Sequence, residues 1–316
     1  MIDLAIETSN LTKIYDQIVV VDHIEIYVKR GELVSILGPN GAGKTTLIKI
    51  LTTVLKPDEG TALINGIDVL KEASAIKSII GTVPQDYVFY EELSAEENLI
   101  FFGSMHGFPK KELELEAKKI LKRLGLANRK DKTRNFSGGM KRRLNIAIAL
   151  IMKPDILFLD EPSAGLDPQA KHVVWDYIKE LKKGGKTIIL TTHDMYEAEM
   201  LSDRVLIVNN GKILAEGAPE TLKEKYSQRN ILEVVFKQND KANEFKSVIE
   251  PNSFIKQVLI EDDKKVNVYF DGGIISFIKI LQEKAIKDVT ELESMSLRQT
   301  TLEDVFLHLT GRRLRS

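Results

Sequence analysis

The chain has 316 residues, 43% of them hydrophobic and 29% charged, and this length fits one large domain followed by a small one. Its net charge of -1 gives no reason to expect nucleic-acid binding, and the lack of cysteine excludes disulfides, zinc–thiolate sites and cysteine nucleophiles. No apolar run reaches the ~20 residues of a membrane-spanning helix, and the acidic N-terminus is unlike a signal peptide. We therefore expect a cytoplasmic protein that works on a membrane only through a partner.

Residues 1–227 alternate predicted strands and helices. The predicted strands lie within residues 1–30, at Leu33–Leu37, within 60–70, at Ile156–Leu159 and at Thr187–Thr191. The predicted helices are Thr45–Leu55, 111–125, Ser137–Met152 and Val173–Lys182. The helix at 111–125 presents one apolar face, formed by Leu113, Ala117, Ile120, Leu121 and Leu124. This pattern predicts an α/β domain with a mostly parallel sheet covered on both faces.

The pattern changes near residue 228, and residues 228–316 are predicted to form a separate α+β domain. Its predicted elements are a strand at Ile231–Phe236, a helix at Lys241–Val248, hairpin strands at Phe254–Ile260 and Val266–Phe270, a helix at Ile274–Glu283 and an extended segment at Asp288–Leu297. This order fits a split βαβ, or ferredoxin-like, arrangement.

A final helix is predicted after residue 300. Thr300 can cap it, with Glu303 three residues on as the second member of a capping box. Its apolar face is predicted to comprise Leu302, Val305, Phe306 and Leu309. The role of the C-terminal domain stays open between a regulatory or dimer-stabilising element and a cap that stabilises the chain's own first domain.

A glycine-rich turn joins the strand Leu33–Leu37 to the next helix and matches the phosphate-binding pattern G-x-x-x-x-G-K-[ST]. In such a turn, backbone N–H groups and the helix N-terminus bind phosphate oxygens, the lysine reaches the β- and γ-phosphates, and the threonine hydroxyl ligates Mg²⁺. The turn therefore predicts a P-loop NTPase. The predicted contacts are Gly38, Pro39, Asn40, Gly41, Ala42, Gly43, Lys44, Thr45 and Thr46, with Lys44 also catalytic and Thr45 on the metal.

Two acids end the apolar strand at Ile156–Leu159. Asp160 follows the strand directly, at the edge of the sheet where ligands bind in open α/β folds, and is predicted to hold Mg²⁺. Glu161 comes one residue later and is predicted to act as the general base that polarises the attacking water.

Ser137, Gly138 and Gly139 open a helix and predict a second anion site, made of backbone N–H groups and a hydroxyl. One nucleotide does not need two such sites from one chain, whereas two chains facing head-to-tail do. A plain capped helix with Ser137 as its N-cap is the alternative, and these residues alone do not decide between the two.

The order and spacing of these motifs resemble the ABC ATPase family over residues 2–225. Phe136 and Met140 replace the leucine and glutamine of the usual signature, which leaves the glutamine's role without a counterpart. The resemblance implies ATP as the nucleotide and adds four further elements. These are Gln85, which senses Mg²⁺ and water, the D-loop Ser163–Asp167, the switch residue His193, and Tyr15, which stacks on adenine.

Within this family the chain looks like the daunorubicin-resistance-type ATPases, through Ser137–Leu144, Glu161–Pro168 and Thr301–Gly311. This implies an ATP-hydrolysing exporter subunit for drugs, lipids or polysaccharides, with a helical subdomain in the ATPase domain. It implies a homodimer, an integral membrane permease as partner, and a place on the inner face of the cell membrane. The alternative is a soluble, non-transport ABC ATPase that regulates a macromolecular partner.

Residues 86–110 are unusually aromatic and follow Gln85. Internal packing of a helical subdomain is the favoured interpretation for any single one of them, whereas a cluster left exposed would indicate the surface that docks on the membrane subunit. The residues concerned are Tyr87, Phe89, Tyr90, Leu93, Phe101, Phe102 and Phe108.

Overall fold

The computed structural model describes residues 3–226, 230–239, 241–270 and 292–310. The chain divides into two compact units with the boundary between Pro219 and Glu220, so that helix α8 (Pro219–Tyr226) groups with the second unit. The boundary expected from the sequence falls after residue 227, on the other side of that helix. Within the described ranges, no helix combines the length and apolar character needed to cross a bilayer.

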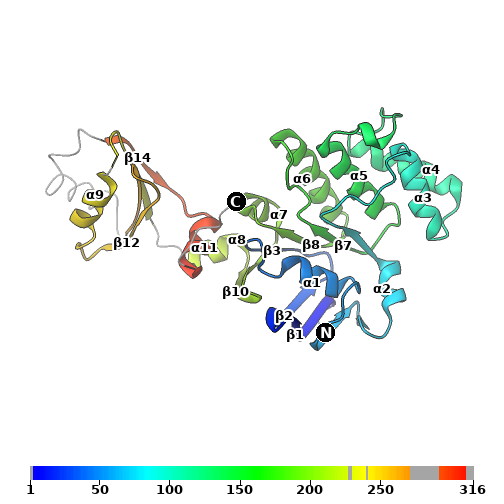
Figure 1. Cartoon of the computed structure of the whole chain (residues 1–316), viewed down its shortest axis with the longest axis horizontal. Coiled ribbons are helices and arrows are strands. Elements are labelled where there is room, and N and C mark those ends of the chain that lie inside the picture. Colours follow the sequence, from blue (N-terminus) through cyan, green and yellow to red (C-terminus); the bar gives the residue numbers. More distant parts are fainter. Residues whose placement is uncertain (1–2, 227–229, 240, 271–291, 311–316) are drawn as a thin grey trace. The chain divides into compact units, whose positions relative to one another are not determined.

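The first unit is built on a six-stranded sheet with the order β10-β9-β3-β8-β7-β6 (Figure 1). Its strands are β3 (Leu33–Leu37), β6 (Ile80–Val83), β7 (Ile156–Asp160), β8 (Thr187–Thr192), β9 (Arg204–Asn209) and β10 (Lys212–Gly217). All neighbours pair in parallel except the edge strand β10. Every residue of β3, β7 and β8 is buried, which confirms the prediction of a mostly parallel sheet covered on both faces.

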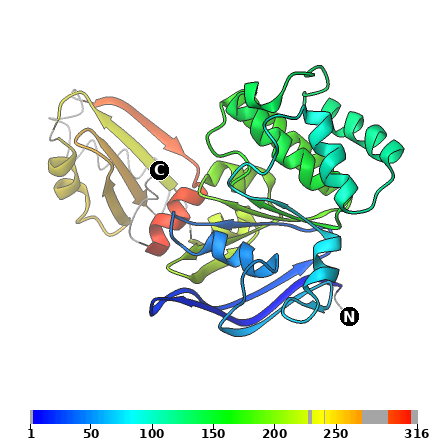
Figure 2. The same ribbon diagram turned by 45° about the vertical axis from the view of Figure 1, so that its right-hand side comes forward.

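A second, antiparallel sheet lies on one side of the first and has the order β2-β1-β4-β5. Its strands are β1 (Leu4–Tyr15), β2 (Ile18–Lys29), β4 (Glu59–Ile64) and β5 (Ile67–Asp68). Figure 2 shows helix α1 (Lys44–Leu51) between the two sheets. One hydrophobic core joins Leu47 and Ile48 of α1 to Phe158 of the parallel sheet and Ile64 of the antiparallel sheet. The core thus fixes the start of α1 against the end of β3.

A group of helices forms a second hydrophobic core with the other face of the parallel sheet (Figure 1). These helices are α3 (Ala95–Met105), α4 (Lys110–Arg123), α5 (Gly138–Leu150) and α6 (Pro168–Lys183), with the shorter α2 (Ala73–Ile79) and α7 (Met195–Leu201) elsewhere in the unit. Within the group, α3 and α4 pack on α5. The apolar face predicted for α4 is buried at all five positions. Side chains cap four of these helices at their starts: Ser94 caps α3, Ser137 caps α5, Asp167 caps α6 and Asp194 caps α7.

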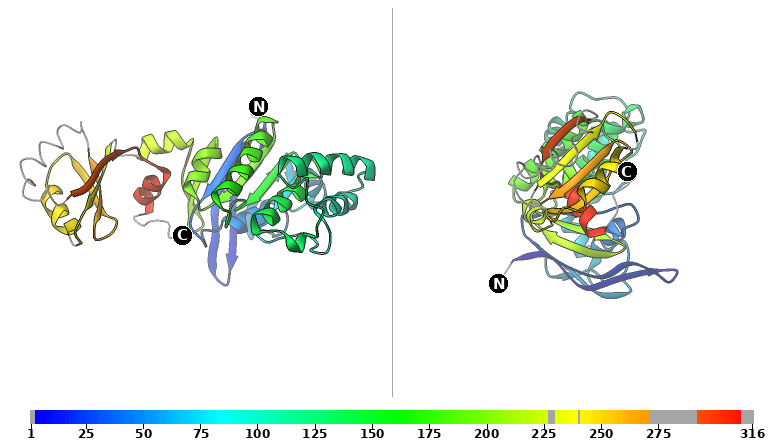
Figure 3. Two further views of the ribbon diagram at one scale, coloured as in Figure 1. Left: turned by 90° about the horizontal axis from the view of Figure 1, so that it is seen from above. Right: turned by 90° about the vertical axis from the view of Figure 1, so that its left-hand side faces the viewer.

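The second unit contains an antiparallel sheet with the order β12-β13-β11-β14. Its elements are β11 (Asn230–Phe236), α9 (Lys241–Ile249), β12 (Ile255–Ile260), β13 (Lys265–Phe270), β14 (Leu292–Arg298) and α11 (Leu302–Thr310). β13 lies between β11 and β12, so the unit β11–α9–β12 is split as predicted, and Figure 3 shows α9 beside this sheet. The predicted helix Ile274–Glu283 and the start of the segment Asp288–Leu297 lie outside the described residues.

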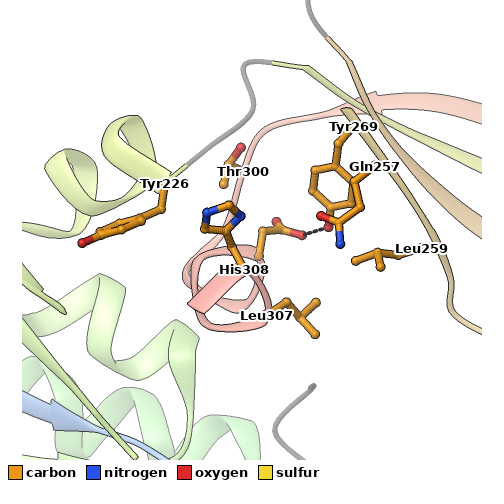
Figure 4. Close-up of a pocket in the computed structure, with 8 residues that line it drawn as sticks. Tyr226, Gln257, Leu259, Tyr269, Thr300, Leu307 and His308 are labelled. Atoms are coloured by element: carbon orange, nitrogen blue, oxygen red, sulfur yellow. Dashed lines mark hydrogen bonds between the residues drawn. The ribbon is translucent and has the colours of Figure 1, made fainter. Parts of the chain in front are cut away.

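The predicted capping box of the last helix is wrong by one residue. α11 begins at Leu302, so Thr301 occupies the N-cap position. The Asp304 carboxylate accepts hydrogen bonds from the Thr301 amide and hydroxyl, both at 2.9 Å. The same carboxylate accepts the hydroxyl of Tyr269, which reaches it from β13 (Figure 4). This network selects Thr301 and Asp304 over Thr300 and Glu303. Of the predicted apolar face, Leu302, Val305 and Phe306 are buried and Leu309 is partly buried.

Candidate functional site

A cavity of about 510 Å³ opens at the carboxyl ends of β3, β7 and β8, the edge where open α/β sheets bind ligands. Its volume lies in the range of small-molecule sites. The residues that line it are Val20, Asn40, Gly41, Ala42, Gly43, Lys44, Thr45, Thr46, Gln85, Glu161, Ala164 and His193. The structure therefore brings the glycine-rich turn together with Gln85, Glu161 and His193 from distant parts of the sequence.

The turn between β3 and α1 needs glycine at both ends. A Cβ atom at Gly38 would lie 2.2 Å from the carbonyl oxygen of Val208. Gly43 has φ +97°, and a Cβ atom there would lie 2.3 Å from the carbonyl oxygen of Val20. Helix α1 starts directly after Gly43, so its N-terminus and the partial positive charge of its first amides face the cavity edge.

Lys44 is only 5% exposed although it carries an ammonium group. Its Nζ donates to the carbonyls of Gly38 at 2.7 Å and Pro39 at 3.0 Å, so the side chain folds back over the turn. Burial lowers the pKa of Lys44, and the nearby Glu161 carboxylate opposes that effect. A compact cation is thus held beside a turn whose shape suits phosphate.

The two acids at the end of β7 have different surroundings. Asp160 is 3% exposed and accepts a hydrogen bond from the hydroxyl of Thr191 on β8. The Glu161 carboxylate has longer contacts: its Oε1 lies 3.5 Å from Lys44 Nζ and 3.2 Å from His193 Nδ1, the latter without hydrogen-bond alignment. Glu161 therefore keeps hydrogen-bonding capacity for a ligand or a water, whereas Asp160 is held in place.

Comparison with known proteins decides the family. Residues 21–164 match the family described as ABC transporter. The chain is 37% identical to the daunorubicin resistance ATP-binding protein DrrA3 of Streptomyces coeruleorubidus, over 98% of this chain and 97% of that protein. It is 35% identical to the linearmycin resistance ATP-binding protein LnrL of Bacillus subtilis, over 98% and 99% of the two chains. The chain is an ATP-binding subunit of the ABC transporter family. It is an ATPase.

Solved structures agree with this assignment. A structure described as the ATP-binding subunit of an ABC transporter has a TM-score of 0.65 and 31% identity, covering 70% of this chain and 93% of that one. An ATP-binding cassette solved as a dimer in a post-hydrolysis state with ADP and Pi has a TM-score of 0.63 and 29% identity, covering 67% and 98%. The first unit thus has the P-loop fold of ABC ATPases.

Several predicted site residues of this ABC ATPase do not line the cavity. Ser137 and Gly138 are exposed at the start of α5, and Gly139 is half-buried. Tyr15, at the end of β1, is 42% exposed with the Lys13 ammonium 5.5 Å from its ring centre. Within one chain, therefore, the serine–glycine helix start and the glycine-rich turn are not parts of the same cavity.

Sequence reasoning missed three side chains that organise this edge. Thr191 binds the Asp160 carboxylate and also accepts the Glu161 amide at 3.1 Å. Arg142 and Asn145, both on α5, bind backbone groups around Gln85 and Glu161. The sequence offered no signal for Arg142 and Asn145, because their partners are backbone atoms, which every residue type supplies.

The aromatic stretch after Gln85 divides into two groups. Phe89, Phe102 and Phe108 are partly buried and pack against the helical core, as favoured from the sequence. Tyr90 and Phe101 are 53% and 38% exposed, with ring centres 4.8 Å apart. The exposed pair forms a small aromatic patch on the ATPase surface.

Proposed function

We propose that this ABC ATPase works as a homodimer that drives export through a separate integral membrane permease. The observation that carries the proposal is the match over nearly the whole chain, including the C-terminal unit, to proteins named for drug resistance. A Nod factor export ATP-binding protein of Sinorhizobium fredii supports export too, at 36% identity over 99% of this chain and 88% of that protein. Drugs, lipids or polysaccharides are the substrate classes that we propose.

The residues predicted from the sequence have separate roles in the proposed nucleotide site. The glycine-rich turn, from Gly38 to Thr46, binds the phosphates and Lys44 neutralises their charge. Glu161 orients the attacking water, His193 faces the γ-phosphate, and Tyr15 stacks on adenine. The spacing of these residues supports the assignment, because Lys44 and His193 both lie within 3.5 Å of the Glu161 carboxylate.

Thr45, Gln85 and Asp160 are the proposed holders of Mg²⁺. They offer a hydroxyl, an amide oxygen and a carboxylate, the hard oxygen donors that this ion prefers. Thr45 and Gln85 line the same cavity, whereas Asp160 ends β7 directly before the lining residue Glu161. Bound Mg²⁺ would neutralise charge that develops on the phosphate oxygens.

The proposed dimer places Ser137, Gly138 and Gly139 of one chain on the γ-phosphate held by its twin. Two features support this arrangement. Ser137 and Gly138 are exposed at a helix N-terminus, where anions bind well, and they lie outside their own chain's cavity. Met140, which stands where the family has glutamine, is half-buried against the helical core. The serine–glycine start alone therefore carries this role.

The permease would bring the protein to the inner face of the cell membrane. The exposed pair Tyr90 and Phe101, close to Gln85 in sequence, supports a docking surface at this point. We further propose that residues 1–227 and 228–316 act as an ATPase domain and an accessory domain. Deleting 228–316 and measuring ATPase rate and dimerisation would separate a regulatory role of the second domain from a stabilising one.

Affinity purification of the tagged full-length chain from detergent-solubilised membranes tests the proposal. We expect one integral membrane protein to co-purify, and the substitutions Tyr90→Ser and Phe101→Ser to reduce its recovery. Leu115→Ser is a matched control, because Leu115 is 64% exposed on α4 and has no proposed role. Recovery of a soluble partner without any membrane protein would favour a regulatory ABC ATPase and overturn the proposal.

A further inference from the structure

Arg142 on helix α5 is 3% exposed and has all five of its N–H donors matched to backbone carbonyls. Nη1 donates to Pro84 at 2.8 Å and to Gln85 at 2.9 Å. Nη2 donates to Asp160 at 2.6 Å and also to Glu161, and Nε donates to Pro162 at 3.0 Å. One side chain thus spans the segment around Gln85 and the segment around Glu161.

These five carbonyls lie where two neighbouring parallel strands end. β6 stops at Val83 and β7 at Asp160, and the two strands pair directly. Beyond the strand ends the carbonyls lose their sheet partners, and buried carbonyls need hydrogen bonds. Arginine alone offers five donors in a planar fork, so lysine, with three donors on one nitrogen, could not serve both segments.

Arg142 also fixes the backbone of Glu161 from one side while Thr191 fixes it from the other. The Glu161 amide donates to the Thr191 carbonyl at 3.0 Å and to its hydroxyl at 3.1 Å. Its carbonyl accepts from Arg142. Between these anchors Glu161 has φ +49°, a conformation uncommon for residues other than glycine. The direction in which its carboxylate leaves the backbone therefore depends on both.

A second side chain of α5 completes the connection to the segment around Gln85. Asn145, one turn after Arg142, donates to the Asp86 carbonyl at 2.8 Å and accepts from the Val88 amide at 3.1 Å. Tyr87, between them, donates its hydroxyl to the Gly138 carbonyl at 3.4 Å. Helix α5, residues 84–88 and Glu161 are therefore joined by one continuous set of hydrogen bonds.

Among the described residues, no ion pair joins the Arg142 guanidinium to a carboxylate. Burial lowers the pKa of its guanidinium, and the charges of Tyr87, Asp160 and Glu161 oppose this. Buried charges are often replaceable by apolar side chains without loss of stability. Stability by itself is thus a weak reason for a buried arginine at this position.

We propose that Arg142 is a positioning residue for ATP hydrolysis. It holds the Glu161 carboxylate and the Gln85 segment in fixed relation to α5, whose first turn carries Ser137. Movement of α5 would then move both groups together. The inference rests on the proposed roles of Glu161 and Gln85, and it predicts that loss of Arg142 slows hydrolysis while ATP binding by the glycine-rich turn is kept.

The test compares Arg142→Lys and Arg142→Gln with the parent full-length chain, measuring kcat, KM for ATP and the Kd of ATP. We expect kcat to fall about 10-fold for lysine and up to about 100-fold for glutamine, with KM and Kd changed less than about threefold. Arg204→Gln is the matched control. Arg204 is a partly buried arginine that binds Glu32. It lies at the start of β9, whereas the cavity opens at the carboxyl ends of the parallel strands. The substitution Arg204→Gln should lower thermal stability and leave kcat within about twofold.

Unchanged kcat in folded Arg142 variants, or a loss of ATP affinity equal to the loss of kcat, would overturn the inference. Should both variants fail to fold, Asn145→Ala decides: a fall of about threefold in kcat at constant ATP affinity supports it, and unchanged kcat overturns it. Glu161→Gln in the same assay distinguishes a failure of the proposed nucleotide site from a failure of the proposed role of Arg142. If Glu161→Gln keeps full turnover, the proposed site fails. If Glu161→Gln is slow but the Arg142 variants are not, only the role of Arg142 is lost.

Discussion

Glu161 and Asp304 are both buried carboxylates, 8% and 5% exposed, but they have opposite surroundings. Asp304 accepts five hydrogen bonds: one from Tyr269, two from Arg298 and two from Thr301, at 2.6 to 2.9 Å. In the part of the chain that the structure describes, the Glu161 carboxylate has only the longer contacts to Lys44 and His193, at 3.5 and 3.2 Å. A saturated carboxylate has no capacity left for a substrate, whereas one with free lone pairs does.

The two carboxylates lie in different units of the chain, and their surroundings indicate a structural role for Asp304 and a chemical role for Glu161. Asp304 links β13, β14 and α11, so its hydrogen bonds hold the second unit together. Glu161 has its backbone fixed and its side chain left open, which suits a group that must bind and release water in each cycle. Replacing Glu161 should therefore reduce turnover, whereas replacing Asp304 should reduce stability.

The largest expected effect is that of Glu161→Gln on turnover. Loss of a positioned general base lowers rates by about 10² to 10⁴-fold. We expect kcat to fall by at least about 100-fold, with the Kd of ATP changed less than about threefold because the glycine-rich turn is intact. Steady-state phosphate release and nucleotide titration check this. Asp304→Asn is the control, and an equal loss of turnover in that variant would contradict the proposed difference between the two carboxylates.

Asp304→Ala should instead affect stability. The substitution removes the closer of two carboxylates beside Arg298, the other being Glu233 at 4.0 Å, and breaking a buried ion pair typically lowers stability by 3–5 kcal/mol. Because Arg298 is partly exposed, we expect the lower end, roughly 3 kcal/mol, in the free energy of unfolding of the second unit. Urea unfolding measures it. Asp263 is exposed in the turn between β12 and β13, and Asp263→Ala should stay within about 0.5 kcal/mol. The same small change for Asp304→Ala would contradict the account.

Sequence reasoning was successful where a pattern repeats or a motif has fixed spacing. The strands β3, β7 and β8 were predicted from apolar runs, and the apolar face of α4 from its 3.6-residue period. Sequence reasoning failed where a single buried contact decides which of two neighbouring residues caps a helix. The start of α11 is the example, where Thr301 and Asp304 take the places predicted for Thr300 and Glu303. The role of Arg142 was out of reach, because its partners are carbonyls about 20 and 60 positions away, and any residue type supplies a carbonyl.

The pH dependence of stability sharpens the contrast further. Burial raises the pKa of Asp304, but hydrogen bonds from Arg298, Thr301 and Tyr269 outweigh it and leave that pKa below its ordinary value. A lowered carboxyl pKa stabilises the folded state above the unfolded value of about 3.9, and this stabilisation is lost as the pH falls below that value toward the lower folded pKa. The stability difference between the parent and Asp304→Asn should therefore shrink from about pH 5 to pH 3. A difference independent of pH would be inconsistent with a charged Asp304.

Glu197 is a third buried carboxyl group and should show the smallest effect. It accepts hydrogen bonds from Ser163 at 2.5 Å and Trp175 at 2.9 Å, and burial raises its pKa despite them. An acid with a raised pKa loses stabilisation as the pH rises above its unfolded value, and glutamine does not. Glu197→Gln should change stability by less than about 1 kcal/mol at pH 5 and gain relative to the parent toward pH 8. Urea titrations at several pH values measure both, and a relative loss toward pH 8 would contradict a raised pKa of Glu197.

The central claim, that ATP lies between the turn carrying Lys44 in one chain and the helix start at Ser137 in another, is tested most directly by light scattering on trapped protein. Glu161→Gln with saturating ATP and Mg²⁺ should have the mass of two chains and return to one when ATP is removed. Adding Ser137→Ala should abolish the dimer while each chain still binds ATP. A monomer at saturating ATP, or a dimer that forms equally well without the Ser137 hydroxyl, would contradict the account.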